Sequence, residues 1–216
     1  MCTMLILTAC FSLLAGACSD PAAGLSAGKD SPEAGPTTAL KRDPIGCTIE
    51  GEPTCALGKA PNVRIILTNQ TDADIYLVGS LDASDCKWRY PHCFFEVTGP
   101  DGAPVARRIL RCGNKNTLRE KDFVKVRPGG TFDPYQRVDE YGFFSAHQLD
   151  PDNFKLLGKY RIRFGYSTKS EDLAAWAGDG GPAVAANDRI VAMFKGVSKV
   201  EVMSNELMIT VVEGEK

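Results

Sequence analysis

Short runs of β-branched and aromatic residues, separated by turn-forming residues, limit most strongly what this chain can fold into. The clearest case is residues 93–98 and 104–110, which flank Gly99-Pro100-Asp101-Gly102. The Asp-Gly pair supplies the positive φ of a tight turn, so this stretch predicts a hairpin. The same pattern predicts further strands at 62–68, 74–78, 123–126, 160–166 and 206–212, the first two pairing as a second hairpin. No helix alternates regularly with these strands, which favours an all-β, antiparallel sandwich.

One region interrupts the strand pattern near the C-terminal end. Ser170 can cap a short helix over residues 170–176, because Glu171 and Asp172 suit a first turn. A glycine-rich loop follows at 178–182, and residues 183–193 favour a second short helix. We therefore expect a short helical insertion near residues 170–192.

Two C-terminal motifs resemble a known fold family. Gly158-Lys159-Tyr160-Arg161-Ile162-Arg163 resembles the tyrosine corner of immunoglobulin-like domains, where a Tyr hydroxyl returns to the preceding backbone. With Ser204-Asn205-Glu206-Leu207, it is similar to extracytoplasmic immunoglobulin-like sandwiches of bacteria, and to a sandwich class named after a Bacillus intracellular proteinase inhibitor. The resemblance spans residues 60–212 at most. It implies an immunoglobulin-like sandwich and carries over no inhibitory residue.

The N-terminal stretch is an apolar run that ends in small residues. Residues 1–17 lead into Ala15-Gly16-Ala17-Cys18, which resembles a bacterial lipoprotein signal. About 14 apolar residues are too few to span a bilayer, which needs about 20. The resemblance implies that residues 1–17 are removed and that Cys18 carries the lipid.

The signal departs from the lipoprotein pattern at two places. No Lys or Arg stands near the start, and Ala15 occupies the position where Leu is usual. A cleaved secretory signal and a buried structural segment remain alternatives. Ser19 follows the cysteine, where an Asp would favour retention in the inner membrane, so we expect an outer-membrane lipoprotein facing the periplasm or the exterior.

Residues 18–44 are rich in Ala, Gly, Ser and Pro and contain few large apolar residues. Such a segment cannot bury enough surface to offset its ordering entropy, so we expect a flexible tether of about 25–30 Å root-mean-square length. Residues 45–216 then form one β-sandwich domain. The net charge of −2 argues against a nucleic-acid partner.

Five cysteines follow Cys18, in a chain whose signal directs it to a compartment where disulfides persist. Cys47 and Cys55 bracket a loop with Gly and Pro, and Cys93 and Cys112 flank the Asp-Gly hairpin. We expect bonds Cys47–Cys55 and Cys93–Cys112, with Cys86–Cys112 as the alternative.

A zinc site of Cys86, His92, Cys93 and Cys112 is a rival interpretation of the same residues. The short Cys-x-x-Cys pairs of structural zinc sites are missing from it, so we expect neither a metal nor another cofactor.

The candidates for catalysis are isolated. Ser84-Asp85-Cys86-Lys87 matches Ser-x-x-Lys without its companion motifs, and His92 and His147 have no evident partner. The acidic pairs Asp139/Glu140 and Asp150/Asp152 have a spacing that is ordinary for loops. We therefore expect no catalytic residue and no enzyme.

Aromatic residues near Arg89 give the remaining hint. Trp88, Arg89, Tyr90 and Tyr135 lie in loop-like stretches, where rings and a guanidinium suit a binding surface. The rings of Trp88 and Tyr90 could equally close one end of the sandwich.

The sequence thus predicts a lipid-anchored cell-envelope protein that acts as a non-enzymatic binding or structural module. Its partners would be the membrane, through Cys18, and an envelope protein or ligand. A proteinase-inhibitor-like module and a divergent hydrolase or metal-dependent enzyme are the alternatives.

Overall fold

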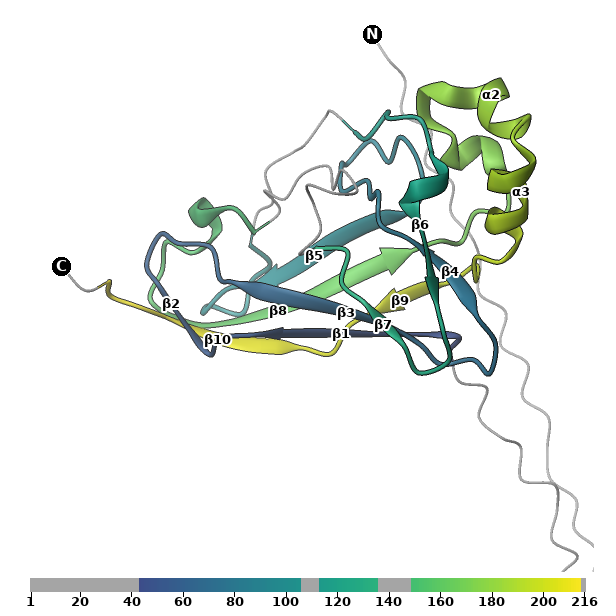
Figure 1. The fold of residues 1–216 in the computed structure, drawn as a ribbon. Helices are drawn as coiled ribbons and strands as arrows, with labels where there is room; N and C mark the ends of the chain where they lie inside the picture. The colour runs from purple at the N-terminus through teal and green to yellow at the C-terminus, as the bar shows by residue number, and fades with distance from the viewer. Residues whose placement is uncertain (1–42, 106–112, 136–148, 215–216) are drawn as a thin grey trace, which may run out of the picture. The chain divides into compact units, whose positions relative to one another are not determined.

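Antiparallel strands are the main regular structure of the folded chain, which also contains two short α-helices (Figure 1). The computed structural model describes residues 43–105, 113–135 and 149–214, which belong to one unit spanning residues 41–216. The predicted signal segment, Cys18 and all but the last two residues of the predicted tether lie outside the described residues. No helix in the described ranges is long and apolar enough to cross a membrane.

The elements follow one another in this order: β1 (Ile45–Gly51), β2 (Thr54–Ala56), β3 (Val63–Asn69), β4 (Ile75–Val78), β5 (His92–Thr98), β6 (Phe123–Val126), β7 (Thr131–Phe132), β8 (Gly158–Ser167), α2 (Gly181–Ala185), α3 (Asp188–Lys195), β9 (Glu201–Met203) and β10 (Leu207–Val212). The strands expected at 62–68, 74–78, 123–126, 160–166 and 206–212 are therefore confirmed as β3, β4, β6, β8 and β10, with ends shifted by one or two residues. β1, β2, β7 and β9 were not expected.

The strands form three sheets. One has the order β1-β3-β7, a second has the order β2-β10-β8-β5 with β9 also on β8, and the third pairs β4 with β6. All pairs are antiparallel except β2 with β10. The main core contains buried side chains from the first two sheets, such as Ile49 and Leu67 from one and Ile162 and Phe164 from the other.

One predicted hairpin is confirmed as far as the structure describes it. The turn after β5 is closed by a hydrogen bond from the Gly99 N–H to the Ala103 carbonyl at 2.8 Å, and Gly102 has a φ of 79°. Thr98 bridges Pro104, while residues 106–110 lie outside the described ranges.

The other predicted hairpin is wrong, because β3 and β4 do not pair with each other. The Asn69 side chain explains the change of sheet. Its amide nitrogen donates to the carbonyls of Ala73 and Val126 at 2.8 and 2.9 Å, and its oxygen accepts from the Thr71 N–H. These bonds direct the chain away from β3, so that β4 pairs with β6 instead.

The tyrosine corner is formed as the sequence indicates. The Tyr160 hydroxyl accepts from the Leu156 N–H at 3.2 Å and donates to the Leu156 carbonyl at 3.1 Å. In the second C-terminal motif, the Asn205 side chain accepts from the Ile49 N–H and donates to the Ile49 carbonyl, at 2.9 and 3.1 Å. Asn205 thus satisfies backbone groups on the outer edge of β1 that would otherwise be unpaired.

The helical insertion exists but differs from the expected pattern. Residues 173–176 form a single 3-10 turn whose cap is Asp172, not Ser170. The expected second helix is split into α2 and α3, because the Asn187 side chain accepts from the N–H groups of Arg189 and Ile190 and starts a new helix there. These short helices cover a second core with Trp176, Phe194 and Leu118.

The domain therefore has two distinct ends (Figure 1). The helices lie at one end, which we call the helical end. The chain enters the domain at this end too, because Pro44 accepts a hydrogen bond from Gln70 and Asp43 lies close to β9. At the opposite end β10 finishes and the loop before β8 turns back.

Candidate functional site

A fully buried arginine organises the loops of the helical end. Arg89 is 1 % exposed. Its Nη1 donates to the carbonyls of Asn116 and Trp176 at 2.9 and 3.4 Å, and its Nη2 donates to the Ser80 carbonyl at 2.9 Å and to the Ser80 hydroxyl. One guanidinium therefore joins three segments of the chain. The expectation that Arg89 belongs to a binding surface is not compatible with this burial.

Two buried carboxylates lie near this guanidinium and favour its charge. Burial lowers the pKa of Arg89 to about 10, against the opposing effect of Asp122 and Asp82. The side chain therefore stays protonated at neutral pH. Asp82 also accepts from the N–H groups of Ser84 and Arg89, at 2.9 and 3.3 Å, which fixes the loop from residue 82 to residue 89.

The segment from Gly113 to Arg119 is held against this loop. The Asn114 amide donates to the Ser80 hydroxyl and to the Leu81 carbonyl, both at 3.1 Å. On its other side, the Lys115 carbonyl accepts from the Asp179 N–H at 2.8 Å. The buried charge of Arg89 and these buried polar groups cost free energy unless each partner is in place. The arrangement therefore favours one loop conformation over others.

Trp88 lies on the outside of this fixed loop. It is 50 % exposed, and the Lys115 ammonium lies 4.1 Å from the centre of its ring. A Cβ at position 113 would come within 1.9 Å of the Trp88 ring, so any larger residue there would have to displace the ring. Trp88 is thus held over residues 113 and 115 with much of one side in solvent.

The two other aromatic residues of the predicted surface are packed inside. Tyr90 is half-buried between His92 and Trp176, with ring centres 4.0 and 5.7 Å apart. Tyr135 packs edge-on against Phe95 of the main core at 5.6 Å, and burial raises its pKa. Of the four predicted surface residues, only Trp88 presents its ring to solvent.

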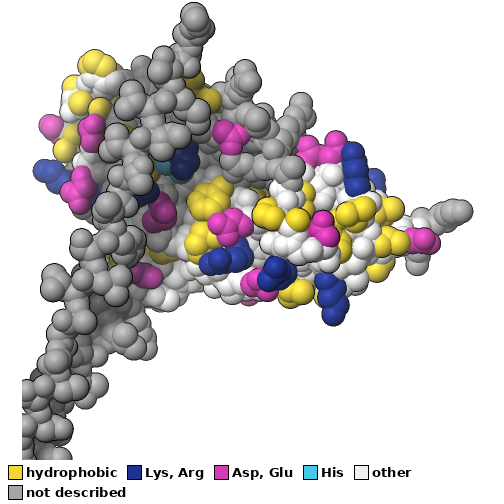
Figure 2. All heavy atoms as spheres, turned by 180° about the vertical axis from the view of Figure 1, so that it is seen from behind, with side chains coloured by type: hydrophobic (Ala, Val, Ile, Leu, Met, Phe, Trp, Pro, Cys, Tyr) yellow, Lys and Arg dark blue, Asp and Glu magenta, His cyan; other side chains and the backbone are white. Residues whose placement is uncertain are grey.

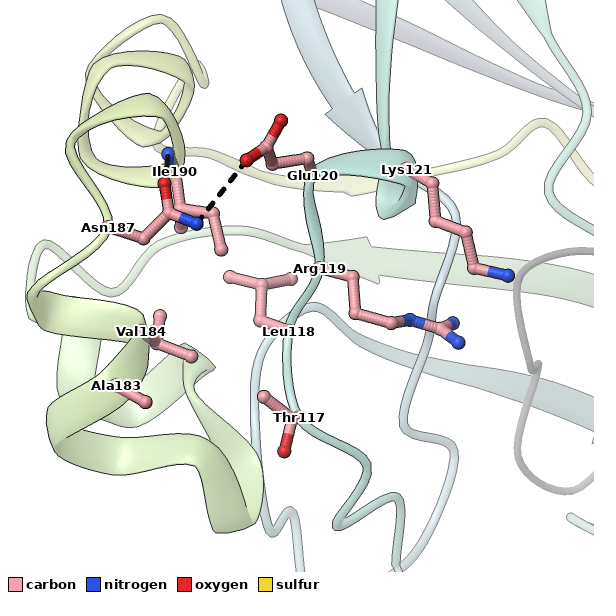
Figure 3. Close-up of a pocket in the computed structure, with 9 residues that line it drawn as sticks. All are labelled: Thr117, Leu118, Arg119, Glu120, Lys121, Ala183, Val184, Asn187 and Ile190. Carbon is pink, nitrogen blue, oxygen red and sulfur yellow. Dashed lines mark hydrogen bonds between the residues drawn. The ribbon is translucent and has the colours of Figure 1, made fainter.

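An apolar groove lies farther along the same segment, between residues 117–121 and helices α2 and α3 (Figure 3). Its volume is about 440 Å³. Leu118, Val184 and Ile190 give it apolar walls. At its rim Glu120 and Asn187 point toward each other and are joined by a hydrogen bond of 3.3 Å. No sequence motif predicted this groove, because its residues come from segments about 65 positions apart in sequence.

The residues considered for catalysis do not assemble into a reactive group. Ser84 lies in a loop, and its Oγ and the Nδ1 of His92 are both buried without a hydrogen-bond partner among the described residues. Burial lowers the pKa of His92 to about 4, against the opposing effect of Asp82. The imidazole is therefore neutral at physiological pH, and no hydrogen bond relates it to Ser84.

The acidic pairs have structural roles where they are described. Asp150 caps a 3-10 turn by accepting from the Asp152 N–H, and Asp152 pairs with Lys155 at 3.0 Å. Asp139, Glu140 and His147 lie outside the described residues. Within the described ranges, no group of three or more potential ligands could hold a metal ion.

The structure joins no two of the described cysteines to each other. Cys47 and Cys55 lie in β1 and β2, on either side of residues 52–53, but these strands belong to different sheets and the structure does not join the two cysteines as we expected. Cys86 is exposed, and Cys93 is buried in β5, where burial raises the pKa of its thiol. Cys112 lies outside the described residues, so its pairing with Cys93 or Cys86 stays a prediction.

Comparisons with known proteins supply no family for this arrangement. No protein-family model matches the chain, and no curated protein matches its sequence.

Proposed function

We propose that this protein is a lipid-anchored cell-envelope module that binds a protein partner without catalysis, through the surface formed by Trp88, Lys115 and the adjoining groove. The observation that carries the proposal is the contrast between a half-exposed Trp88 and the buried Arg89 beside it. A large aromatic side chain in solvent is a frequent anchor of protein interfaces. Here it stands on a loop with a fixed conformation.

The fixed loop supports binding for an energetic reason. A partner that meets an ordered loop does not have to supply the entropy of ordering it, so more of the contact energy appears as affinity. The groove beside the loop offers walls of Leu118, Val184 and Ile190 to an apolar side chain of the partner. Arg119, Glu120 and Lys121 at its rim offer charges of both signs.

We further propose that the fold is an immunoglobulin-like sandwich with a helical addition. The main core with side chains from two sheets and the tyrosine corner at Tyr160 support this. The separate β4–β6 sheet and the helices would be additions that build the helical end.

The location in the envelope rests on the sequence of the first 18 residues. Replacing Cys18 by Ala should release the protein from membranes if Cys18 carries the lipid. Membrane fractionation of both forms measures this directly, and unchanged fractionation would remove the anchor from the proposal.

The binding proposal is tested by crosslinking the anchored protein in its native host and identifying captured proteins by mass spectrometry. Trp88→Ala should lower the yield of a saturable partner at least about tenfold, as expected for an interface anchor. Met208→Ala is the matched control, because Met208 is also about half exposed but lies in β10, outside this surface. Equal yields from the two variants would contradict the proposal.

The identity of the partner separates the proposed module from its alternatives. A protease whose turnover falls stoichiometrically with added protein would make this a proteinase-inhibitor-like module. A turnover by the protein itself, lost on chelation, would instead indicate a metal-dependent enzyme.

A further inference from the structure

Four exposed apolar side chains gather at the end of the domain opposite the helices. Leu57, Leu156, Leu157 and Val212 are 41, 58, 50 and 41 % exposed, and we call them the apolar tip. Hydrogen bonds place their segments side by side: the Leu57 N–H donates to the Val212 carbonyl at 2.8 Å, and the Gly58 N–H donates to the Phe154 carbonyl at 2.9 Å. Figure 2 shows hydrophobic side chains beside Lys and Arg near the C-terminal end of the domain.

The backbone beneath the tip is fixed. The Tyr160 hydroxyl bonds both backbone groups of Leu156, and Gly158 opposes Val211 in the β8–β10 pair. A Cβ on Gly158 would come within 2.9 Å of Pro100, so the chain turns here in close contact with the neighbouring loop. The leucines are therefore held outward by structure and are not the exposed part of a loose chain.

Lysines stand next to these leucines in a repeated arrangement. The sequence is Leu57-Gly58-Lys59 in one loop and Lys155-Leu156-Leu157-Gly158-Lys159 in the other, and all three lysines are exposed. Four acidic residues also lie at this end: Asp101 and Asp152 line a pocket with Leu156, Asp150 caps the turn before it, and Glu213 follows Val212. Asp152 pairs with Lys155. Lys59 and Lys159 form no ion pair with the described residues.

We propose that the apolar tip inserts into the interface of a lipid bilayer that contains anionic headgroups. Leucines that project from fixed loops can enter the boundary between headgroups and acyl chains, while the neighbouring lysines keep their ammonium groups among the phosphates. The alternation of Leu and Lys distinguishes this end from the groove of the helical end, whose apolar walls are recessed behind a rim of both charges. The tip is thus a membrane contact separate from the surface proposed for the protein partner.

The length of chain before the domain allows this contact in a protein anchored at Cys18. Asp43 lies 25 positions after Cys18, and an extended chain covers at most about 3.5 Å per residue, or roughly 85 Å. The ten residues of β8 span only about 33 Å. The tip can therefore reach the bilayer that holds the anchor, and the anchor raises its local concentration so that a weak contact suffices. This step rests on the proposed anchor, whereas the lipid affinity of the tip does not.

The test places a reporter at the tip of the full protein. Leu156→Trp is reconstituted into vesicles of phosphatidylcholine and phosphatidylglycerol, with or without brominated acyl chains that quench nearby tryptophan. Lys121→Trp, at the rim of the groove on the helical end, is the matched control, and the unsubstituted protein gives the background of Trp88 and Trp176. We expect at least about twice as much bromolipid quenching for Leu156→Trp as for Lys121→Trp, and less in vesicles without phosphatidylglycerol. Equal quenching of the two variants would overturn the proposal.

A second measurement separates the tip from the anchor. Residual membrane association of Cys18→Ala is compared with that of Cys18→Ala carrying Leu156→Asp and Leu157→Asp, and the same pair of Asp substitutions is examined by circular dichroism for retained folding. If the tip binds lipid, the Asp substitutions should lower the residual association at least about fivefold. Both variants lack Cys18, so this comparison does not depend on whether Cys18 is acylated in the unsubstituted protein. Residual association that the Asp substitutions leave unchanged would reject the tip, as would equal quenching of the two Trp variants. Full retention of Cys18→Ala would reject only the anchor.

Discussion

The two ends of the domain fix their loops by different chemistry. At the helical end a buried, charged guanidinium donates to carbonyls of residues 80, 116 and 176, which lie 9, 27 and 87 positions from Arg89 in sequence. At the apolar tip one neutral hydroxyl bonds the backbone only four residues away. The guanidinium joins segments that are distant in sequence, whereas the hydroxyl closes a local turn.

The difference predicts how each end responds to change. A buried charge is stable only while its partners remain, so losing one group should affect the whole helical end. A neutral hydroxyl with two hydrogen bonds contributes less, and its loss should remain local. The surface that we propose for a protein partner lies on loops held by the charged Arg89, while the proposed lipid contact lies on a turn held by the neutral Tyr160 hydroxyl.

The largest expected effect is the loss of Arg89. Arg89→Ala removes the charge that faces Asp82 and Asp122 and leaves at least two buried carbonyls without a donor, so it should lower the free energy of unfolding by about 3–5 kcal/mol. Urea denaturation measures this. Arg163→Ala is the matched control, because Arg163 and its partner Glu96 both have about half-exposed side chains and lie 3.6 Å apart, and an exposed pair of this kind contributes less than about 1 kcal/mol. Similar losses for both variants would show that the guanidinium does not organise the helical end.

The same contrast explains what the sequence could predict. The tyrosine corner is a local signature, since the Tyr and its partner are four residues apart, and it was predicted correctly. Strands with clear alternation, such as β8, were predicted correctly as well, because every second residue from Tyr160 to Phe164 is buried. Both depend on residues that are close in sequence.

The misinterpreted features depend on contacts that are distant in sequence. Arg89 stands between two aromatic residues in a turn-rich stretch and resembles a surface residue until the carbonyls of three separate segments converge on it. β1 and β2 were missed because Cys47 and Cys55 suggested a bridged loop, although their strands are completed by partners such as Leu67 and Val211. The groove could not be predicted because its two walls meet only in the folded chain.

An acid titration should weaken the helical end before the tip. Burial holds the pKa of His92 at about 4, below its ordinary value of 6.5, with Lys87 and Lys169 acting in the same direction and Asp82 opposing them. The unfolded state therefore binds a proton that the folded state does not between these two pH values. Stability is fully present above about pH 6.5 and falls as the pH decreases toward 4, at roughly 1.4 kcal/mol per pH unit, which is at most about 3.5 kcal/mol and less where solvent screens the ring.

His92→Gln tests this assignment. The variant removes the titrating group, so its urea denaturation midpoint should depend less on pH between 6.5 and 4 than that of the unsubstituted protein. Hydrogen exchange at residues 80–92 and 155–160 locates the effect, which we expect in the first range only. An unchanged pH dependence in His92→Gln would assign the acid sensitivity to another group.

The smallest expected effect is the loss of the Tyr160 hydroxyl. Tyr160→Phe keeps the ring, which packs against Phe154 at 5.2 Å between ring centres, and removes only the two hydrogen bonds to Leu156. The free energy of unfolding should fall by about 1 kcal/mol, because the freed backbone groups of an exposed residue can bond water. Hydrogen exchange should quicken near residues 155–158 and stay unchanged in residues 113–119. Tyr166→Phe is the matched control, since its buried hydroxyl lies 3.5 Å from the Val78 nitrogen, at the outer limit of a hydrogen bond. If Tyr160→Phe loosened residues 113–119 as strongly as the tip, the two ends would be coupled. The Tyr160 hydroxyl would then not act only locally, and its contrast with the long-range Arg89 guanidinium would not hold.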